Sequence, residues 1–167
     1  MLKRTLMING LEKKLVVDPE ETLANVLRNQ LYLTGTKVGC NQGQCGCCSV
    51  ILDSKVVRSC ITKMKRVPEN AGICTIEGIG RPGHLHALQL AWMVHGGAQC
   101  GFCTPGFLMN SYALLEKHDN PDDETIKEWL QSNLCRCTGY EGIREAVQYA
   151  IKNKNKVIFF MGFSVLD

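Results

Sequence analysis

The sequence has no hydrophobic run long enough to cross a membrane, and it has little excess charge of either sign. Its 167 residues carry 19 basic and 16 acidic side chains, for a formal net charge of +3. That excess is too small and too evenly spread to predict a nucleic-acid-binding surface. The apolar stretch near the N-terminus is far shorter than a signal peptide needs, and no segment reaches the roughly 20 apolar residues of a membrane span. We therefore expect a cytoplasmic protein that binds neither nucleic acid nor membrane.

Cysteine, in contrast, is abundant, with ten residues in the chain. Disulfides are rare in a reducing compartment, and a disulfide framework is typical of small secreted chains that carry an export signal. Scattered cysteines could be small buried hydrophobes. Most of these, however, are clustered and separated by glycines, which favours metal ligation.

The first group of cysteines lies in the stretch GCNQGQCGCCSV, which begins at Gly39. Three of its thiols have the spacing C-x4-C-x2-C, and another cysteine follows, as in plant-type ferredoxins that bind a 2Fe-2S cluster. The glycines let the backbone approach a cluster closely and direct amides at its sulfurs. Zinc sites more often use paired C-x2-C units. The predicted ligands are Cys40, Cys45, Cys48 and Cys60.

The sequence around this group predicts a small β-rich domain. Apolar runs flank the turn Asn9-Gly10, and a second pair of runs flanks Asp53-Ser54, so two hairpins are expected. Asp18-Pro19 is expected to open a helix, with Pro19 as its first residue. Two hairpins, one helix and a cysteine loop resemble the β-grasp fold of plant-type ferredoxins over residues 1–76.

Not every cysteine or histidine is expected to bind metal. Cys47 is interpreted as a small filler beside Cys48, and Cys74, in an apolar run, as a buried core residue. The histidines are interpreted as packing or surface residues: His84, His86, His95 and His118.

The second half of the sequence has helical periodicity. After the segment GIGRPG, apolar residues recur at helical spacing in four segments, which predicts four helices in a compact bundle. We expect a linker at residues 77–83, a helical domain at 84–153 and an apolar tail at 154–167. The apolar run of that tail is too short to cross a bilayer, and we expect the tail to dock on a partner.

A second group of cysteines lies at the ends of these helices, in the motifs CGFC and CRC. Its members are Cys100, Cys103, Cys135 and Cys137. Thr104 is expected as a helix N-cap and Pro105 as the first helical residue, which would place Cys103 where the helix dipole favours a thiolate. A four-thiolate site is predicted, but spacing alone leaves both an iron–sulfur cluster and zinc open.

Taken together, these motifs resemble a known family. GCNQGQCGCCSV, RSC, GGAQCGFCTPGF and NLCRCTGYEGI are similar to the iron–sulfur part of the xanthine oxidase family, the molybdenum hydroxylases, over about residues 1–150. GTKVGC, ITKMKRV and TIEGIG most resemble the single-chain aldehyde oxidoreductases of anaerobic bacteria. The resemblance implies an α+β chain, with a β-grasp ferredoxin domain followed by an all-α four-helix-bundle domain. Each domain would hold one 2Fe-2S cluster on its four cysteines.

The resemblance also implies a function as an electron-transfer subunit that contributes no catalytic residue. Electrons would leave a molybdopterin cofactor, of the cytosine dinucleotide type, on a large molybdenum-binding catalytic subunit. They would pass through the helical-domain cluster and then the ferredoxin-like cluster to an acceptor. The acceptor could be a flavin subunit, a ferredoxin or a flavodoxin.

The resemblance also implies that two residues contact the pterin. Gln99 matches a family glutamine that hydrogen-bonds it, and Cys137 matches the cluster ligand that lies against it. From the sequence alone, the favoured interpretation of Gln99 is instead a helix-end amide that satisfies a carbonyl. The alternative functions are a free-standing two-cluster ferredoxin and a zinc-stabilised interaction module, while the substrate is not encoded in this chain.

Overall fold

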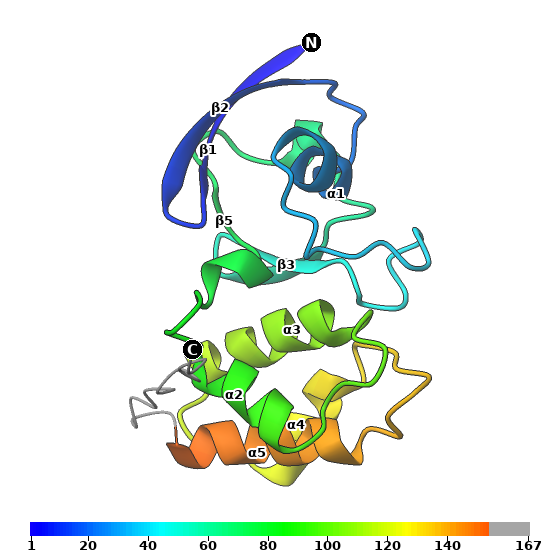
Figure 1. Ribbon diagram of the computed structural model, residues 1–167. Helices are drawn as coiled ribbons and strands as arrows, with labels where there is room; N and C mark the ends of the chain where they lie inside the picture. The colour runs from blue at the N-terminus through cyan, green and yellow to red at the C-terminus, as the bar shows by residue number, and fades with distance from the viewer. Residues whose placement is uncertain (154–167) are drawn as a thin grey trace, which may run out of the picture.

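A computed structural model describes residues 1–153 of the chain. Figure 1 shows two halves stacked on one another, a β-sheet with a short helical segment above and a group of helices below. The predicted tail at 154–167 lies outside the described residues. None of the described helices is long and apolar enough to span a membrane.

The N-terminal half is built on a five-stranded sheet of order β2-β1-β5-β3-β4. Its strands are β1 (Leu2–Ile8), β2 (Leu11–Val17), β3 (Ser49–Leu52), β4 (Lys55–Arg58) and β5 (Gly72–Cys74). The hairpins β1–β2 and β3–β4 are antiparallel, and all four residues of their turns, Asn9-Gly10 and Asp53-Ser54, have positive φ. Strand β5 lies between the hairpins, parallel to β1 and antiparallel to β3. Both predicted hairpins are confirmed.

One helical segment packs on this sheet, and it begins later than predicted. It consists of α1 (Leu23–Asn25) and the π-helical turn η1 (Val26–Gln30). Asp18 and Pro19 form a turn instead, in which the Asp18 carboxylate accepts a hydrogen bond from the Glu20 amide at 2.8 Å. The hydroxyl of Thr22 caps the helix. The helical segment buries Leu23, Val26 and Leu27 in the core of this half.

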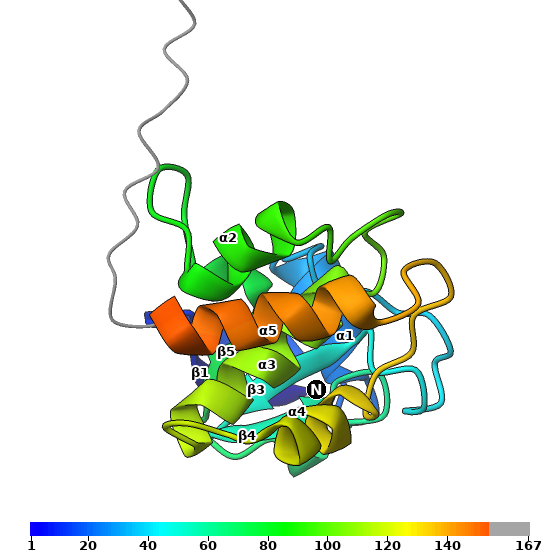
Figure 2. The ribbon, with the colours of Figure 1, turned by 90° about the horizontal axis from the view of Figure 1, so that it is seen from below.

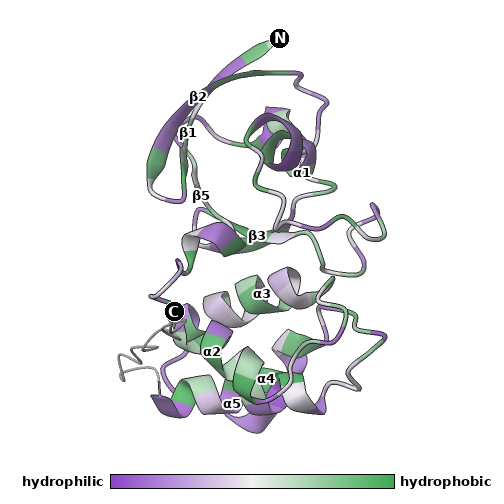
Figure 3. Cartoon of the chain, in the orientation of Figure 1, coloured by the Kyte–Doolittle hydropathy of each residue, from purple (hydrophilic) through white to green (hydrophobic). Residues whose placement is uncertain are grey.

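The C-terminal half contains the four predicted helices. They are α2 (Ala87–Val94), α3 (Thr104–Lys117), α4 (Asp123–Leu130) and α5 (Glu141–Asn153). Figure 2 shows α5 running across α3, with α2 on one side and α4 on the other. Figure 3 shows apolar and polar residues alternating around α4 and α5, as expected for helices with one buried face. Their apolar faces meet in one core that includes Leu88, Phe107, Ile126, Ile143 and Val147.

Helix α3 packs against the sheet and so holds the two halves together. Ile51 on β3 packs with Met109 and Ala113 of this helix in a buried cluster. The helix begins at Thr104, one residue earlier than predicted, so Cys103 occupies the N-cap position.

Two 3-10 turns complete the fold, η2 (Met64–Arg66) and η3 (Ile76–Gly78). The second opens the segment between the halves, and that segment is closely packed. A Cβ on Gly80 would clash with the side chain of Gln89, and one on Gly78 would clash with Asn9.

Candidate functional site

Both groups of cysteines lie on the same side of the molecule. In Figures 1 and 2 the loop before β3 lies beside the loops that precede α3 and α5. All ten cysteines are free thiols. The fold therefore brings together two sets of thiols that are far apart in the sequence.

The loop before β3 directs several backbone amides at one sulfur. Cys40 Sγ accepts hydrogen bonds from the amides of Gln42 at 3.4 Å, Gln44 at 3.3 Å and Cys45 at 3.4 Å. These bonds, led by the Cys45 and Gln42 amides, lower the pKa of Cys40 to about 6. Such a concave group of N–H donors stabilises a thiolate and fits the sulfur ligand of an anionic cluster.

The four thiols of this first set form two pairs. The Cys40 and Cys45 thiols interact with each other. The Cys60 thiol faces Cys48, and burial raises the pKa of Cys60 to about 11. Because a 2Fe-2S cluster has two irons and takes four cysteine ligands, two pairs of sulfurs suit its symmetry.

Two glycines of this loop are required by close contacts and by backbone conformation. Gly46 has a φ of +75°, and a Cβ there would lie 2.6 Å from the carbonyl oxygen of Ser132 in the helical half. Gly39 leaves room for the ligand sulfurs, since a Cβ there would lie 3.1 Å from Cys45 Sγ. The glycines thus allow the loop to approach both its own thiols and the other half of the chain.

The second set of thiols is also paired. Cys137 Sγ lies 3.6 Å from Cys100 Sγ, and Cys103 interacts with Cys135. The amide and hydroxyl of Thr138 donate to Cys135 Sγ at 3.4 and 3.1 Å. Burial opposes ionisation of Cys135, but the hydrogen bonds from Thr138 and from the Cys137 amide outweigh it and lower its pKa. At Cys103, burial raises the pKa to about 12 and opposes the effect of the helix N-terminus.

The second set runs from the surface inward. Cys100 and Cys137 are exposed, whereas Cys103 is buried. Gln99, next to Cys100 in the chain, is exposed as well. One edge of this set therefore faces outward, and the other faces the sheet half of the protein.

Within residues 1–153, no three Cys, His, Asp or Glu side chains gather closely enough to hold a single metal ion. Four thiolates on one zinc ion would lie within about 4 Å of one another, because each Zn–S bond is about 2.3 Å.

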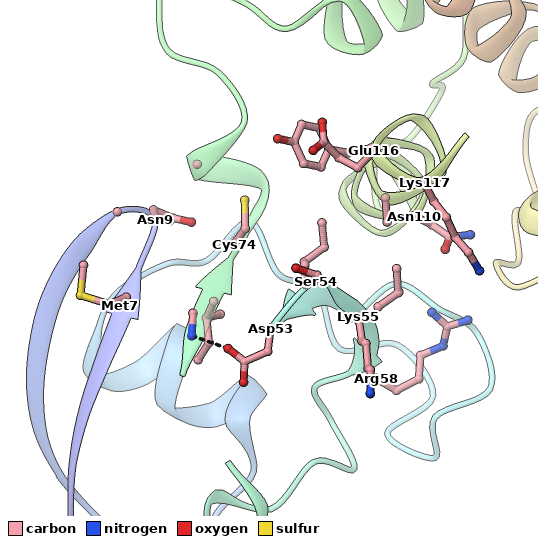
Figure 4. Close-up of a pocket in the computed structure, with 18 of the residues that line it drawn as sticks. Met7, Asn9, Asp53, Ser54, Lys55, Arg58, Cys74, Asn110, Glu116 and Lys117 are labelled. Atoms are coloured by element: carbon pink, nitrogen blue, oxygen red, sulfur yellow. Dashed lines mark hydrogen bonds between the residues drawn. The ribbon is translucent and has the colours of Figure 1, made fainter. Parts of the chain in front are cut away.

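Two cysteines stand outside these pairs. Cys47 is buried against the helical core, as expected for a filler, and burial raises its pKa to about 12. Cys74 is only half-buried, so the prediction of a core residue was wrong. Figure 4 shows it beside an open groove between the sheet and α3, a groove whose lining residues also include Glu116 and none of the eight paired cysteines.

Polar residues that were not predicted from the sequence join the two sets. The guanidinium of Arg58 donates to the hydroxyl of Ser49 and to the carbonyl of Ser132. Asn133 Nδ2 donates to the carbonyl of Gly46 at 2.9 Å. No motif marks these residues, because each acts on a partner that is distant in sequence.

Comparison with known proteins identifies both halves. A family described as "2Fe-2S iron-sulfur cluster binding domain" matches residues 6–76, and one described as "2Fe-2S binding domain" matches residues 75–148. The aldehyde oxidoreductase of Megalodesulfovibrio gigas is 56% identical over 152 residues, which are 90% of this chain and 17% of that protein. The nicotine 6-hydroxylase small subunit of Paenarthrobacter nicotinovorans is 46% identical over 151 residues, covering 89% of this chain and 90% of that subunit.

This chain belongs to the two-cluster 2Fe-2S family of the molybdenum hydroxylases. A solved structure agrees, since the aldehyde oxidoreductase from Desulfovibrio gigas superposes with a TM-score of 0.90 at 54% identity, covering 93% of this chain and 17% of that one. The chain thus spans 17% of a long relative and 90% of a small subunit. The predicted α+β fold, a ferredoxin-like sheet domain followed by a helical 2Fe-2S domain, is confirmed, and members of this family are iron–sulfur electron-transfer parts of molybdenum enzymes.

Proposed function

We propose that this chain relays electrons within a molybdenum hydroxylase of the aldehyde oxidoreductase or xanthine dehydrogenase type. Electrons would come from a molybdopterin centre on a large catalytic partner and leave to an external acceptor. The observation that carries the proposal is the arrangement of eight thiols as two sets of paired sulfurs on one side of the molecule.

The two ligand sets have distinct members in this proposal. The first is Cys40, Cys45, Cys48 and Cys60, and the second is Cys100, Cys103, Cys135 and Cys137. A 2Fe-2S cluster supplies a centre that accepts and releases one electron, at a potential set by hydrogen bonds to sulfur and by exposure. The chain's part is to hold the thiolates, to keep water from the buried sulfurs and to donate hydrogen bonds, as Thr138 does to Cys135.

We place the partner's pterin at the exposed edge of the second set. Gln99 and Cys137 lie at this edge, and an amide side chain offers both donors and an acceptor to a pterin ring. Phe102 and Leu134, which flank the same cysteines, are exposed apolar residues of the kind found in protein interfaces. A pterin of the cytosine dinucleotide type belongs to this proposal, as does the large molybdenum-binding subunit that would hold it.

The proposal also assigns the domains, the tail, the acceptor and the location of the complex. Residues 1–76 and 84–153 would be two cluster domains joined by 77–83, and the tail at 154–167 would dock on the partner. The acceptor, whether a flavin subunit, a ferredoxin or a flavodoxin, would take electrons from the first set. The complex would be cytoplasmic. The alternative is a free-standing two-cluster ferredoxin, which would have no permanent partner.

Anaerobic purification of the tagged chain from its own host tests this proposal. We expect about four irons per chain, one molybdenum and a large co-purifying subunit. Two clusters in a monomer without molybdenum would support the free carrier, and a colourless zinc protein would overturn both readings.

A matched pair of variants tests the pterin edge. Gln99→Leu should slow reduction of the clusters by the partner's substrate. Gln131→Leu, at another exposed glutamine, should leave that rate unchanged. Equal rates in the two variants would contradict the role of Gln99.

A further inference from the structure

The two ligand sets meet at a junction between the loop after Cys45 and the segment before Cys135. The amide of Leu134 donates a hydrogen bond to the carbonyl oxygen of Cys45 at 2.9 Å. Beside it, Asn133 Nδ2 donates to the carbonyl of the next residue, Gly46, at 2.9 Å. Two consecutive residues of the helical half therefore bind two consecutive residues of the first cysteine loop.

This junction connects a ligand of one set with a ligand of the other. Cys45 belongs to the first set, and Leu134 immediately precedes Cys135 of the second. From each sulfur, covalent bonds lead to the Leu134–Cys45 hydrogen bond. The two sulfurs are thus linked by continuous backbone that is interrupted by one hydrogen bond.

Beside these hydrogen bonds, further contacts between the two sets are van der Waals contacts. Gly106, in the first turn after Cys103, packs against the backbone of Gly46 and Cys47. The ring of Phe102 lies close to Gly39, because a Cβ there would be 3.4 Å from Phe102 Cε1. Electron tunnelling is weaker across a van der Waals gap than along covalent and hydrogen bonds, so the bonded route is favoured.

Two side chains hold the junction closed. Asn133 is 1% exposed, and its Oδ1 accepts a hydrogen bond from the Ser132 hydroxyl at 3.0 Å, so both ends of its amide are satisfied. Arg58 reaches across from β4 and binds the carbonyl of Ser132 and the hydroxyl of Ser49. A buried polar group that loses its partner is strongly disfavoured, which fixes the position of this segment.

We propose that the hydrogen bond from Leu134 to Cys45 is the electronic bridge between the two clusters, and that Asn133 and Arg58 are positioning residues for it. With a 2Fe-2S cluster bound to each set, the step would be the movement of one electron from a reduced cluster on the second set to an oxidised cluster on the first. No bond forms or breaks and no proton is required. This inference rests on the proposed function, because it needs both clusters in place.

The direct test replaces the Leu134 amide by an ester, through incorporation of the α-hydroxy analogue of leucine. The side chain stays the same, but the donor N–H is removed. The matched control is the α-hydroxy analogue of glutamine at position 131, whose amide donates to Lys127 within the helical half. Each protein is partly reduced by a light pulse, and electron equilibration between the clusters is followed by rapid-freeze EPR.

We expect equilibration to slow in the Leu134 ester and to keep the wild-type rate in the Gln131 ester. Iron content and the two reduction potentials should be unchanged in both esters. A variant that had lost structure would change these properties, so they serve as the control for folding. Equal rates in the two esters would overturn the inference. A larger effect from Phe102→Leu than from the Leu134 ester would also overturn it, in favour of a route through the aromatic ring.

The positioning residues are tested by hydrogen exchange, which does not depend on electron transfer. Leu134 is 58% exposed, so protection of its amide depends on the bond to Cys45. We expect Asn133→Ala and Arg58→Ala to speed exchange in the peptide containing Leu134 by about tenfold or more, and to slow equilibration between the clusters.

Conservative and control variants separate positioning from general destabilisation. Arg58→Lys should recover part of both effects, because a lysine can still donate to the Ser132 carbonyl. Arg4→Ala removes an arginine whose Nε donates to the Val67 carbonyl at 3.1 Å, remote from the junction, and should change neither. Unchanged exchange and unchanged equilibration in Asn133→Ala would refute the positioning role. Fewer than two clusters in the wild-type protein would refute the proposed function itself.

Discussion

Replacing Gly106 by alanine tests how closely the helical half fits against the first cysteine loop. A Cβ at this position would lie 2.9 Å from Cys47 Cα and 2.9 Å from Asn133 Nδ2, with the carbonyl oxygen of Gly46 closer still. Two of these three atoms are backbone, so turning a flexible side chain cannot relieve the clash. The two halves must therefore separate locally.

The size of the effect follows from two opposing contributions. Overpacking a buried contact costs about 1–3 kcal/mol, whereas alanine in place of glycine favours a helix by up to about 1 kcal/mol. Because all three contacts are shorter than 3.0 Å, we expect overpacking of about 2–3 kcal/mol and a net loss of about 1–3 kcal/mol, which for a protein of this length lowers the Tm by about 2–12 °C.

The assay is thermal unfolding of the cluster-loaded protein, followed by circular dichroism and by bleaching of the visible absorption. Gly72→Ala is the matched control, because a Cβ there would meet only Asp53 Oδ1, at 3.6 Å. We expect Gly106→Ala to melt at a lower temperature and Gly72→Ala to melt close to wild type. An unchanged or raised Tm for Gly106→Ala would show that the two halves are not closely packed at this position.

Three further predictions concern single side chains. Thr138→Val removes a hydrogen bond to Cys135 Sγ, and this bond favours the reduced cluster because that form is more negative. The reduction potential of the second cluster should therefore fall by about 20–60 mV in an EPR redox titration. Thr138→Ser, which keeps the hydroxyl, should restore the potential. Burial lowers the pKa of His86, whose ring nitrogen accepts a bond from the backbone of α2. The contribution of neutral His86 to the free energy of unfolding is complete above the unfolded-state pKa of about 6.5, and it is lost as the pH falls toward the lower pKa of the folded state. In denaturant titrations, the wild-type protein should therefore lose more stability than His86→Asn between about pH 7.5 and 5.5. Cys47→Ala should keep all iron, whereas Cys48→Ala should lose one cluster; iron loss in both would make Cys47 a ligand.

The cysteine motifs could be found from sequence because their spacing is local. Cys40 to Cys48 lie in one loop, and the glycines among them are explained by the amides and sulfurs they accommodate. Cys100 and Cys137 are far apart in the chain, but each lies in a short motif at a helix end, and the structure places their sulfurs 3.6 Å apart.

Residues that act across the two halves could not be found in this way. Arg58 is one of many basic residues in the sequence, and its partner Ser132 is 74 positions away. Local competition also displaced one helix start, because the Asp18 carboxylate binds the Glu20 amide and closes a turn before Thr22 can cap the helix. Cys74 was assigned to the core from its apolar neighbours, but its strand ends at the groove between the halves.

The most direct test of the account is an iron determination combined with low-temperature EPR of the anaerobically purified, fully reduced protein. We expect about four irons per chain and two distinct signals of equal intensity, one for each 2Fe-2S cluster. A single signal with about two irons, or zinc in either set of cysteines, would contradict it.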